Sequence, residues 1–292
     1  MASTWAAALA LASSLCFGLA LVTSRIGLRY CDARAAAAIS VPSATLLFYV
    51  AAPFALDGKG FVVQALLLFA LVGLFFPALV TLLTFRSNEE LGPTITGAVS
   101  CTAPLFALLF AGLILGEKIP AHAALACAGI VAGVAVLSWK QHAVRPGFVG
   151  RSLLWPIAGA VVRGLAQVGA KAGLLLWPNP FAAGLIGYTM SSATVIGANR
   201  LGRAVRPRVT RRGIAWIVFT GVLNGGAVLL MYLALASAPV SLVAPVIATY
   251  PLSTALISAL VLREEPLTRR MLAGASITVA AVIYLVASNP GA

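Results

Sequence analysis

The sequence predicts an all-α membrane protein with ten transmembrane helices arranged as two inverted five-helix repeats. Three observations carry this prediction: the composition, the spacing of apolar segments and an internal repeat. Of 292 residues, 61% are hydrophobic and 9% are charged, and the mean hydropathy is +1.02. Soluble domains have about 45–50% apolar and about 25% charged residues. So little charge cannot cover a water-exposed surface, which excludes an ordinary soluble enzyme, a disordered chain and a secreted disulfide scaffold.

Apolar segments of membrane-spanning length follow one another along almost the whole chain. A helix needs about 20 apolar residues to cross about 30 Å of hydrocarbon. Charged residues, prolines and glycines separate ten expected spans, at 4–24, 35–56, 61–85, 93–115, 120–139, 152–173, 180–199, 213–235, 239–262 and 267–287. The short connections between these spans leave no room for a soluble catalytic domain.

The basic residues predict the orientation of the spans. Of the 20 Lys and Arg residues, 16 fall in odd-numbered loops and two, Lys59 and Lys118, in even-numbered loops. Basic residues collect in cytoplasmic loops of membrane proteins. We therefore expect the odd loops in the cytoplasm and both termini outside. The net charge of +13 is explained by topology, so no nucleic-acid partner is expected.

An internal repeat divides the chain into two halves. A shift of 147 residues aligns 91–117 with 238–264, and a shift of 146 residues aligns the first span with the sixth. The most informative matches are Thr102 with Thr249, Pro104 with Pro251, Glu117 with Glu264, Gly18 with Gly164 and Arg25 with Lys171. The domains expected are a first half at 1–140, a cytoplasmic linker at 141–150 and a second half at 151–292. An odd number of helices per half inverts the second half, and such repeats place a binding site near the midplane between them.

Two helix ends carry a resemblance to a known family. The run from Phe106 to Glu117, ending Leu-Gly-Glu, and the run from Leu256 to Glu265 resemble the fourth-helix ending of EamA-type members of the drug/metabolite transporter superfamily. The second copy has Arg263 where glycine is usual, and either Glu264 or Glu265 matches the first copy's acid. The resemblance implies a secondary transporter that exports small metabolites, frequently amino acids, in some members aromatic or broad neutral ones.

Motifs for other functions are missing from the sequence. It has no Walker motif, phosphate-binding glycine loop, metal-ligand cluster or nucleophile with a base. We therefore expect no enzymatic activity, no cofactor and no metal. The expected partners are a small-molecule substrate and the lipid of the cell inner (plasma) membrane, with the chain a monomer or weak dimer. The alternatives are a transporter of nucleobases, sugars or drugs, or a non-transporting membrane assembly partner.

The acidic residues predict how transport is driven. All seven lie at expected helix ends or in loops, whereas proton-coupled exporters commonly use a buried carboxylate within the membrane. We therefore expect transport driven by the substrate gradient rather than obligatory proton antiport. At its helix end, Glu117 is expected to pair with Lys118, with a role in gating as the alternative.

Arg163 is the foremost candidate for the substrate site, because it lies halfway along the sixth span. A charge at that depth is costly and usually faces a water-filled interior. It is expected to bind a substrate carboxylate; alternatively it packs against helix carbonyls or reaches the membrane surface. Gln167 lies one turn away on the same face, and Lys171, nearer the end, is interpreted as an interfacial anchor.

Polar, aromatic and proline positions complete the candidate site. Pro104 and Pro251 are expected to kink their helices, and opened backbone within a membrane is buried or lines a cavity. The other candidate substrate-binding residues are Phe17, Pro77, Ser100, Thr102, Asn224, Thr249, Tyr250, Tyr188 and Tyr232, and Phe85 is a further aromatic candidate for the cavity wall. The alternative for each is helix packing or interhelical hydrogen bonding.

Overall fold

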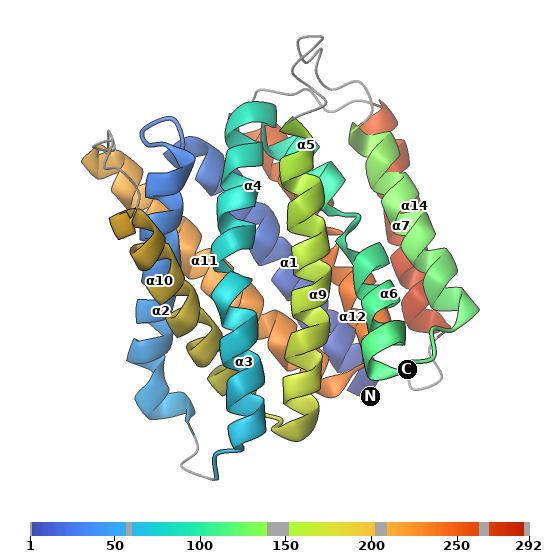
Figure 1. Ribbon diagram of the computed structural model, residues 1–292. Helices are drawn as coiled ribbons and strands as arrows, with labels where there is room; N and C mark the ends of the chain where they lie inside the picture. Colours follow the sequence, from blue (N-terminus) through green and yellow to red (C-terminus); the bar gives the residue numbers. More distant parts are fainter. Residues whose placement is uncertain (1, 57–59, 139–151, 202–208, 263–268, 289–292) are drawn as a thin grey trace.

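The computed structural model describes residues 2–56, 60–138, 152–201, 209–262 and 269–288, and the regular elements within these ranges are helices. The helices, labelled in part in Figure 1, are α1 (Ala2–Gly27), α2 (Ala33–Ala55), α3 (Val63–Phe75), α4 (Ala78–Leu91), α5 (Pro93–Ser100), α6 (Ala103–Leu115), α7 (Ala121–Ser138), α9 (Leu154–Leu176), α10 (Pro180–Leu201), α11 (Arg211–Ser237), α12 (Val240–Ile247), α13 (Tyr250–Ile257), the π-helix η1 (Ser258–Leu262) and α14 (Arg269–Ala287). The expected linker at 141–150 lies outside the described residues.

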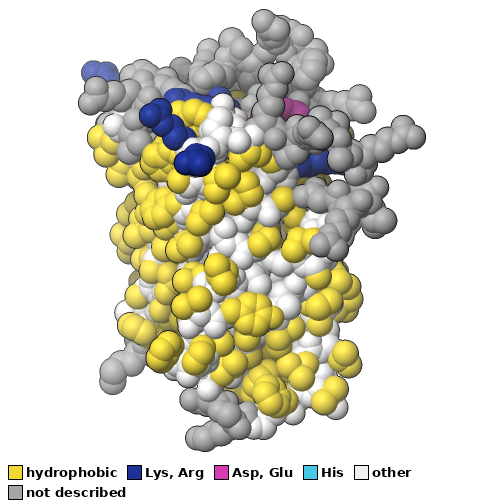
Figure 2. Space-filling view, turned by 90° about the vertical axis from the view of Figure 1, so that its left-hand side faces the viewer, with side chains coloured by type: hydrophobic (Ala, Val, Ile, Leu, Met, Phe, Trp, Pro, Cys, Tyr) yellow, Lys and Arg dark blue, Asp and Glu magenta, His cyan; other side chains and the backbone are white. Residues whose placement is uncertain are grey.

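The all-helical prediction is confirmed, and the helices suit a membrane. Seven segments of the described chain are long and apolar enough to span one, and two shorter apolar helices lie within α7 and α14. Hydrophobic side chains cover most of the face shown in Figure 2, while Lys and Arg gather near one end. We call this the basic end; it holds Arg25, Arg86 and Arg211. A count of ten crossings and the side on which the termini lie stay predictions.

Proline interrupts three of the expected spans near their middle. Phe76 and Pro77 separate α3 from α4, two residues separate α5 from α6, and two more separate α12 from α13. Pro104 and Pro251 each lie in the first turn of the second segment, where the missing N–H removes no helical hydrogen bond. The kinks expected at these two prolines are therefore complete interruptions.

The two halves pack in the same way with opposite direction. In Figure 1 α1 begins and α14 ends at the end opposite the basic end, which we call the termini end, and α1 and α9 run antiparallel. Gly18 lies against Ser253 and the Tyr250 carbonyl, and Gly164 lies against Phe106 and the Ala103 carbonyl. Each contact follows from the other by the shift of 146 or 147 residues, so the sequence repeat is also a repeat of packing.

The hydrophobic core is concentrated toward the termini end. Its largest buried side chains include Phe48, Phe69 and Tyr188, and it draws on both halves. The Phe48 ring lies 5.3 Å from that of Tyr188 and 5.4 Å from that of Phe181. A smaller buried cluster around Phe85 and Ile217 lies toward the basic end. The interface between the halves is therefore packed more tightly at the termini end than at the basic end.

Candidate functional site

Arg163 lies at the centre of the molecule between two aromatic rings from different helices. Its guanidinium carbon is 5.4 Å from the centre of the Phe17 ring and 5.6 Å from that of Tyr250. Both distances suit cation–π attraction. Arg163 is 9% exposed, and its Nε has no hydrogen-bond partner in the described part of the chain. Within that part no carboxylate pairs with the guanidinium either.

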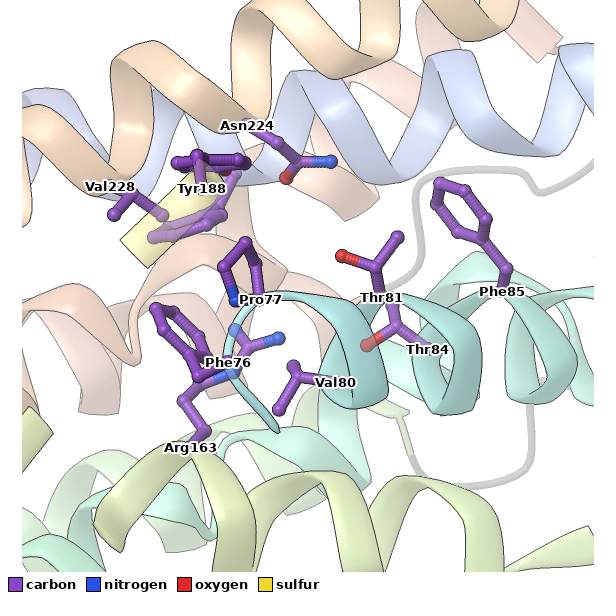
Figure 3. Close-up of a pocket in the computed structure, with 11 residues that line it drawn as sticks. Phe76, Pro77, Val80, Thr81, Thr84, Phe85, Arg163, Tyr188, Asn224 and Val228 are labelled. Atoms are coloured by element: carbon purple, nitrogen blue, oxygen red, sulfur yellow. The ribbon is translucent and has the colours of Figure 1, made fainter. Parts of the chain in front are cut away.

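The Arg163 side chain borders two adjoining cavities between the halves. The first, of ≈ 40 Å³, is lined by Phe17, Phe76, Pro77, Val80, Thr81, Thr84, Phe85, Arg163, Tyr188, Asn224 and Val228. Figure 3 shows Arg163 extending from α9 toward Phe76 and Pro77, with Asn224 and Tyr188 across the space. The second, of ≈ 30 Å³, adds Ala20, Leu21, Ser24 and Tyr250. The second cavity is lined by α1 and α4, which both end at the basic end. The space therefore extends from Arg163 toward the basic end.

Two helix faces supply most of the lining. On α4 and the residue before it, the lining takes Pro77, Val80, Thr81, Thr84 and Phe85, and on α1 it takes Phe17, Ala20, Leu21 and Ser24. Both sets repeat every three or four residues, which places each on one side of its helix. Eight lining residues were not among the candidates predicted from the sequence: Phe76, Val80, Thr81, Thr84, Val228, Ala20, Leu21 and Ser24. The available signal was this spacing, continued from Pro77 and from Phe17.

Six of the predicted site residues line the cavities and five do not. Those that line them are Phe17, Pro77, Arg163, Tyr188, Asn224 and Tyr250. Gln167 lies behind, with its Nε2 3.7 Å from the Met231 sulfur and its Oε1 without a partner in the described structure. The others, Ser100, Thr102, Thr249 and Tyr232, are outside the lining; Thr249 shares a 2.9 Å hydrogen bond with Ser14. For Thr249 the structure therefore supports the alternative of interhelical hydrogen bonding.

Glu117 binds the other half of the molecule, so the expected pairing with Lys118 is wrong. Its carboxylate accepts hydrogen bonds from the backbone N–H groups of Val240, at 3.2 Å, and Ser241, at 3.0 Å, and from the Ser241 hydroxyl. These groups form the first turn of α12, where the N–H groups have no helical partner and the helix dipole favours an anion. The acid thus joins the end of α6 to α12 at the termini end.

Lys171 and Arg25 occupy matching positions at opposite ends. The Lys171 Nζ donates to the carbonyls of Leu235, at 2.7 Å, and Ala238, at 2.9 Å, at the end of α11. Arg25 donates to the carbonyl of Asn88, at 2.8 Å, at the end of α4. Free carbonyls at a helix C-terminus favour a cation. Lys171 therefore caps a helix of its own half, and its role as an interfacial anchor stays a prediction.

The fold and the central cavity together define a membrane protein built from two repeats around a shared internal site. The model of the EamA-like transporter family matches residues 4–139 and 150–287. The chain therefore belongs to the EamA-like transporter family, as the resemblance implied. A search among curated proteins found no match. A solved structure described only as "Crystal structure of protein" is similar in fold, with a TM-score of 0.76 and 16% sequence identity over 97% of this chain and 96% of that one.

Proposed function

We propose that the protein is a secondary transporter that exports small metabolites, amino acids foremost, across the cell inner membrane by alternating access. Its family consists of transporters. A cavity between two inverted halves is the arrangement from which such carriers bind substrate near the midplane. The proposal assigns the basic end to the cytoplasm, since basic residues collect on that side.

The observation that carries the proposal is the buried Arg163 guanidinium without an acidic partner. Burying a lone cation deep in a membrane protein costs several kcal/mol. That cost is offset when a ligand supplies the missing negative charge. In the proposed complex the substrate carboxylate binds Arg163 with charge-assisted hydrogen bonds, and Tyr250 with its apolar neighbours receives the substrate side chain.

The packing of the two ends supports a cycle between two states. At the termini end, the core around Phe48 and the bonds of Glu117 to α12 hold the halves together. Toward the other end a cavity lies between the halves, lined by α1 and α4 of the first half and by Arg163, Asn224 and Tyr250 of the second. In the proposed cycle this is the cytoplasm-facing state, and export requires the closed and open ends to exchange.

The proposed driving force is the gradient of the substrate. Among the described residues, no acid lines either cavity. A proton carrier of the usual kind, a carboxylate buried in the site, is therefore not part of the proposed cycle. Uptake that required an imposed pH gradient would contradict this part of the proposal.

Counterflow in proteoliposomes tests the proposal. The purified chain should exchange radiolabelled amino acids across the vesicle membrane, and protein-free vesicles should not. Arg163→Ala should reduce exchange of carboxylate-bearing substrates roughly 10- to 100-fold, as expected for a lost hydrogen bond to a charged group. Neutral substrates such as nucleosides should change much less. An equal loss for both classes would contradict the role assigned to Arg163.

A further inference from the structure

We infer that the site selects its substrate by net negative charge, so that it carries organic monoanions and does not require the amino group of an amino acid. This inference rests on the proposed function and concerns the same cavity. It predicts that a 2-hydroxy acid binds at least as well as the amino acid with the same side chain. It also predicts that transport of the hydroxy acid moves charge across the membrane.

The first argument is the charge of the cavity. Arg163 is the charged member of the described lining, whose other polar side chains are neutral hydroxyls and one amide, on Ser24, Thr81, Thr84, Tyr188, Tyr250 and Asn224. The acids that the structure describes, Asp32, Glu89, Glu90 and Glu117, lie outside it. The empty site therefore has an excess of one positive charge. A monoanion neutralises that excess, whereas a zwitterion leaves it in place.

The second argument concerns the substrate ammonium. A buried ammonium is favourable only when it is paired and hydrogen-bonded. Phe17 and Tyr250 could attract a cation through their rings, but the Arg163 guanidinium already lies over both. An ammonium two bonds from a carboxylate bound to Arg163 would also lie close to that guanidinium and be repelled by it. An uncharged hydroxyl in the same place avoids the repulsion and can bond to Thr81 or Thr84.

The third argument is the unused hydrogen-bonding capacity around Arg163. The Nε of Arg163 and the hydroxyl of Tyr188 are buried and lack partners in the described structure. Buried polar groups are nearly always satisfied, by protein or by ordered ligand and water. In the proposed complex these side chains turn toward the bound carboxylate, an acceptor with two oxygens, and donate to it. The cavity of ≈ 40 Å³ restricts the part of the substrate held there to a small group of this kind.

A monoanion substrate also supplies the driving force that the cycle needs without a buried acid. If the site returns empty with its positive charge and crosses loaded as a neutral complex, the net charge moved per cycle is that of the substrate. An inside-negative membrane drives an anion outward, and 100 mV corresponds to a roughly 40-fold gradient. Export of the hydroxy acid is then driven by the membrane potential, whereas that of a neutral zwitterion is not.

Matched substrate series test the inference on the purified full-length protein. We would measure binding of L-phenylalanine, L-3-phenyllactate and 2-phenylethylamine, and of L-alanine, L-lactate and ethylamine. The hydroxy acid of each series should bind as tightly as the amino acid or more tightly, and the amine at least roughly 100-fold more weakly. In proteoliposomes with a potassium–valinomycin potential, hydroxy acid efflux should respond to the potential and amino acid efflux should not.

The possible results separate the inference from the proposed function. An amino acid that binds more than threefold tighter than its hydroxy acid, or hydroxy acid flux that ignores the potential, overturns the inference and leaves amino acid transport standing. If none of the carboxylates binds or exchanges, the proposed function fails for this substrate class and the inference fails with it.

Three variants link the result to Arg163. Arg163→Gln should lower hydroxy acid affinity roughly 10- to 100-fold and remove the preference over the neutral zwitterion. Arg163→Lys retains the charge and should retain the order of preference, which keeps the test informative if the glutamine variant does not fold. Arg86→Gln removes an exposed charge that lies over the Trp155 ring, 5.7 Å from its centre, outside the cavities, and should leave both affinities unchanged.

Discussion

The termini end and the basic end are built from equivalent parts of two repeats, yet they are packed differently. At the termini end, Phe48 stacks on Tyr188 and contacts the tilted ring of Phe181 in a dense core. At the basic end, the cavity beside Phe85 reaches inward to Arg163. The two repeats share their sequence pattern. The different packing of the two ends is therefore a difference in conformation as well as in the residues present. In the proposed cycle, the packing that closes one end is exchanged for equivalent packing at the other.

Contacts that are conserved between the ends show which parts can stay rigid. Gly18 and Gly164 make matching close approaches within each half-to-half pair of helices, and Arg25 and Lys171 cap matching helices. Such contacts look the same in both repeats even though the ends differ. We infer that these helix pairs move as units and that the change between states is taken up elsewhere, for which the helix interruptions beside Pro77, Pro104 and Pro251 are suitable places.

The largest difference in stability is expected between the variants Phe48→Ala and Phe85→Ala. Both side chains are 2% exposed, but Phe48 is enclosed by other rings whereas Phe85 borders the cavities. Truncating a buried phenylalanine costs about 3–5 kcal/mol when the gap cannot collapse. The thermal midpoint of the purified protein should fall strongly for Phe48→Ala and clearly less for Phe85→Ala. Equal losses would mean that the basic end is packed as tightly as the termini end.

A smaller effect is expected from Glu117→Ala, which removes the acid that joins α6 to α12. Hydrogen bonds to a charged group contribute about 1.5–3 kcal/mol, and the first-turn N–H groups of α12 would lose their acceptor. The variant should weaken closure of the termini end and so raise labelling of a cysteine introduced at Ala238, which is buried, relative to the same cysteine in the unaltered chain.

Glu117→Gln is the matched control, since it keeps one acceptor and removes the charge. Its labelling should lie between those of the alanine variant and the unaltered chain. If both variants label like the unaltered chain, the bonds between Glu117 and α12 do not hold that end closed.

The sequence predicted the repeat and the kinks at Pro104 and Pro251, which the structure shows as interruptions, because both depend on local, countable features. Proline lacks an N–H wherever it occurs, and a shift of the chain against itself pairs Gly18 with Gly164 without knowledge of the fold. Arg163 stood out for a similar reason, since a charge is rare in an apolar span. These predictions needed no information about which helix touches which.

The lining of the cavity and the partner of Glu117 could not be predicted in this way. In a soluble helix an apolar stripe marks the buried face, but a membrane helix is apolar toward lipid and toward its neighbours alike. The apolar pattern therefore does not mark Thr81 and Thr84 as facing a cavity, and the spacing from Pro77 indicates only that they share its side of the helix. Glu117 meets Ser241 across 124 positions of the chain, whereas Lys118 is adjacent in sequence, so local reasoning chose the wrong partner.

The smallest difference in stability is expected between Lys171→Met and Arg25→Met. Each variant removes one helix cap, and the two caps lie at opposite ends of the molecule. The Lys171 cap is partly buried and makes two short bonds, at 2.7 and 2.9 Å. The second bond of Arg25, to the Glu89 carbonyl, is exposed and 3.3 Å long. Hydrogen bonds from a charged donor are worth more where water is excluded. Lys171→Met should therefore lower the free energy of unfolding by about 1–2 kcal/mol, and Arg25→Met by less.

Comparing thermal midpoints of the two variants in the same detergent checks this difference, because methionine retains most of the apolar length of either side chain. Bound substrate should shift the thermal midpoints upward. If a bound carboxylate holds the cytoplasm-facing state, it should raise the midpoints of both variants by similar amounts, since neither cap contacts the cavity. A variant that lost this stabilisation would show that its cap is coupled to Arg163, and the caps would then belong to the moving part of the molecule.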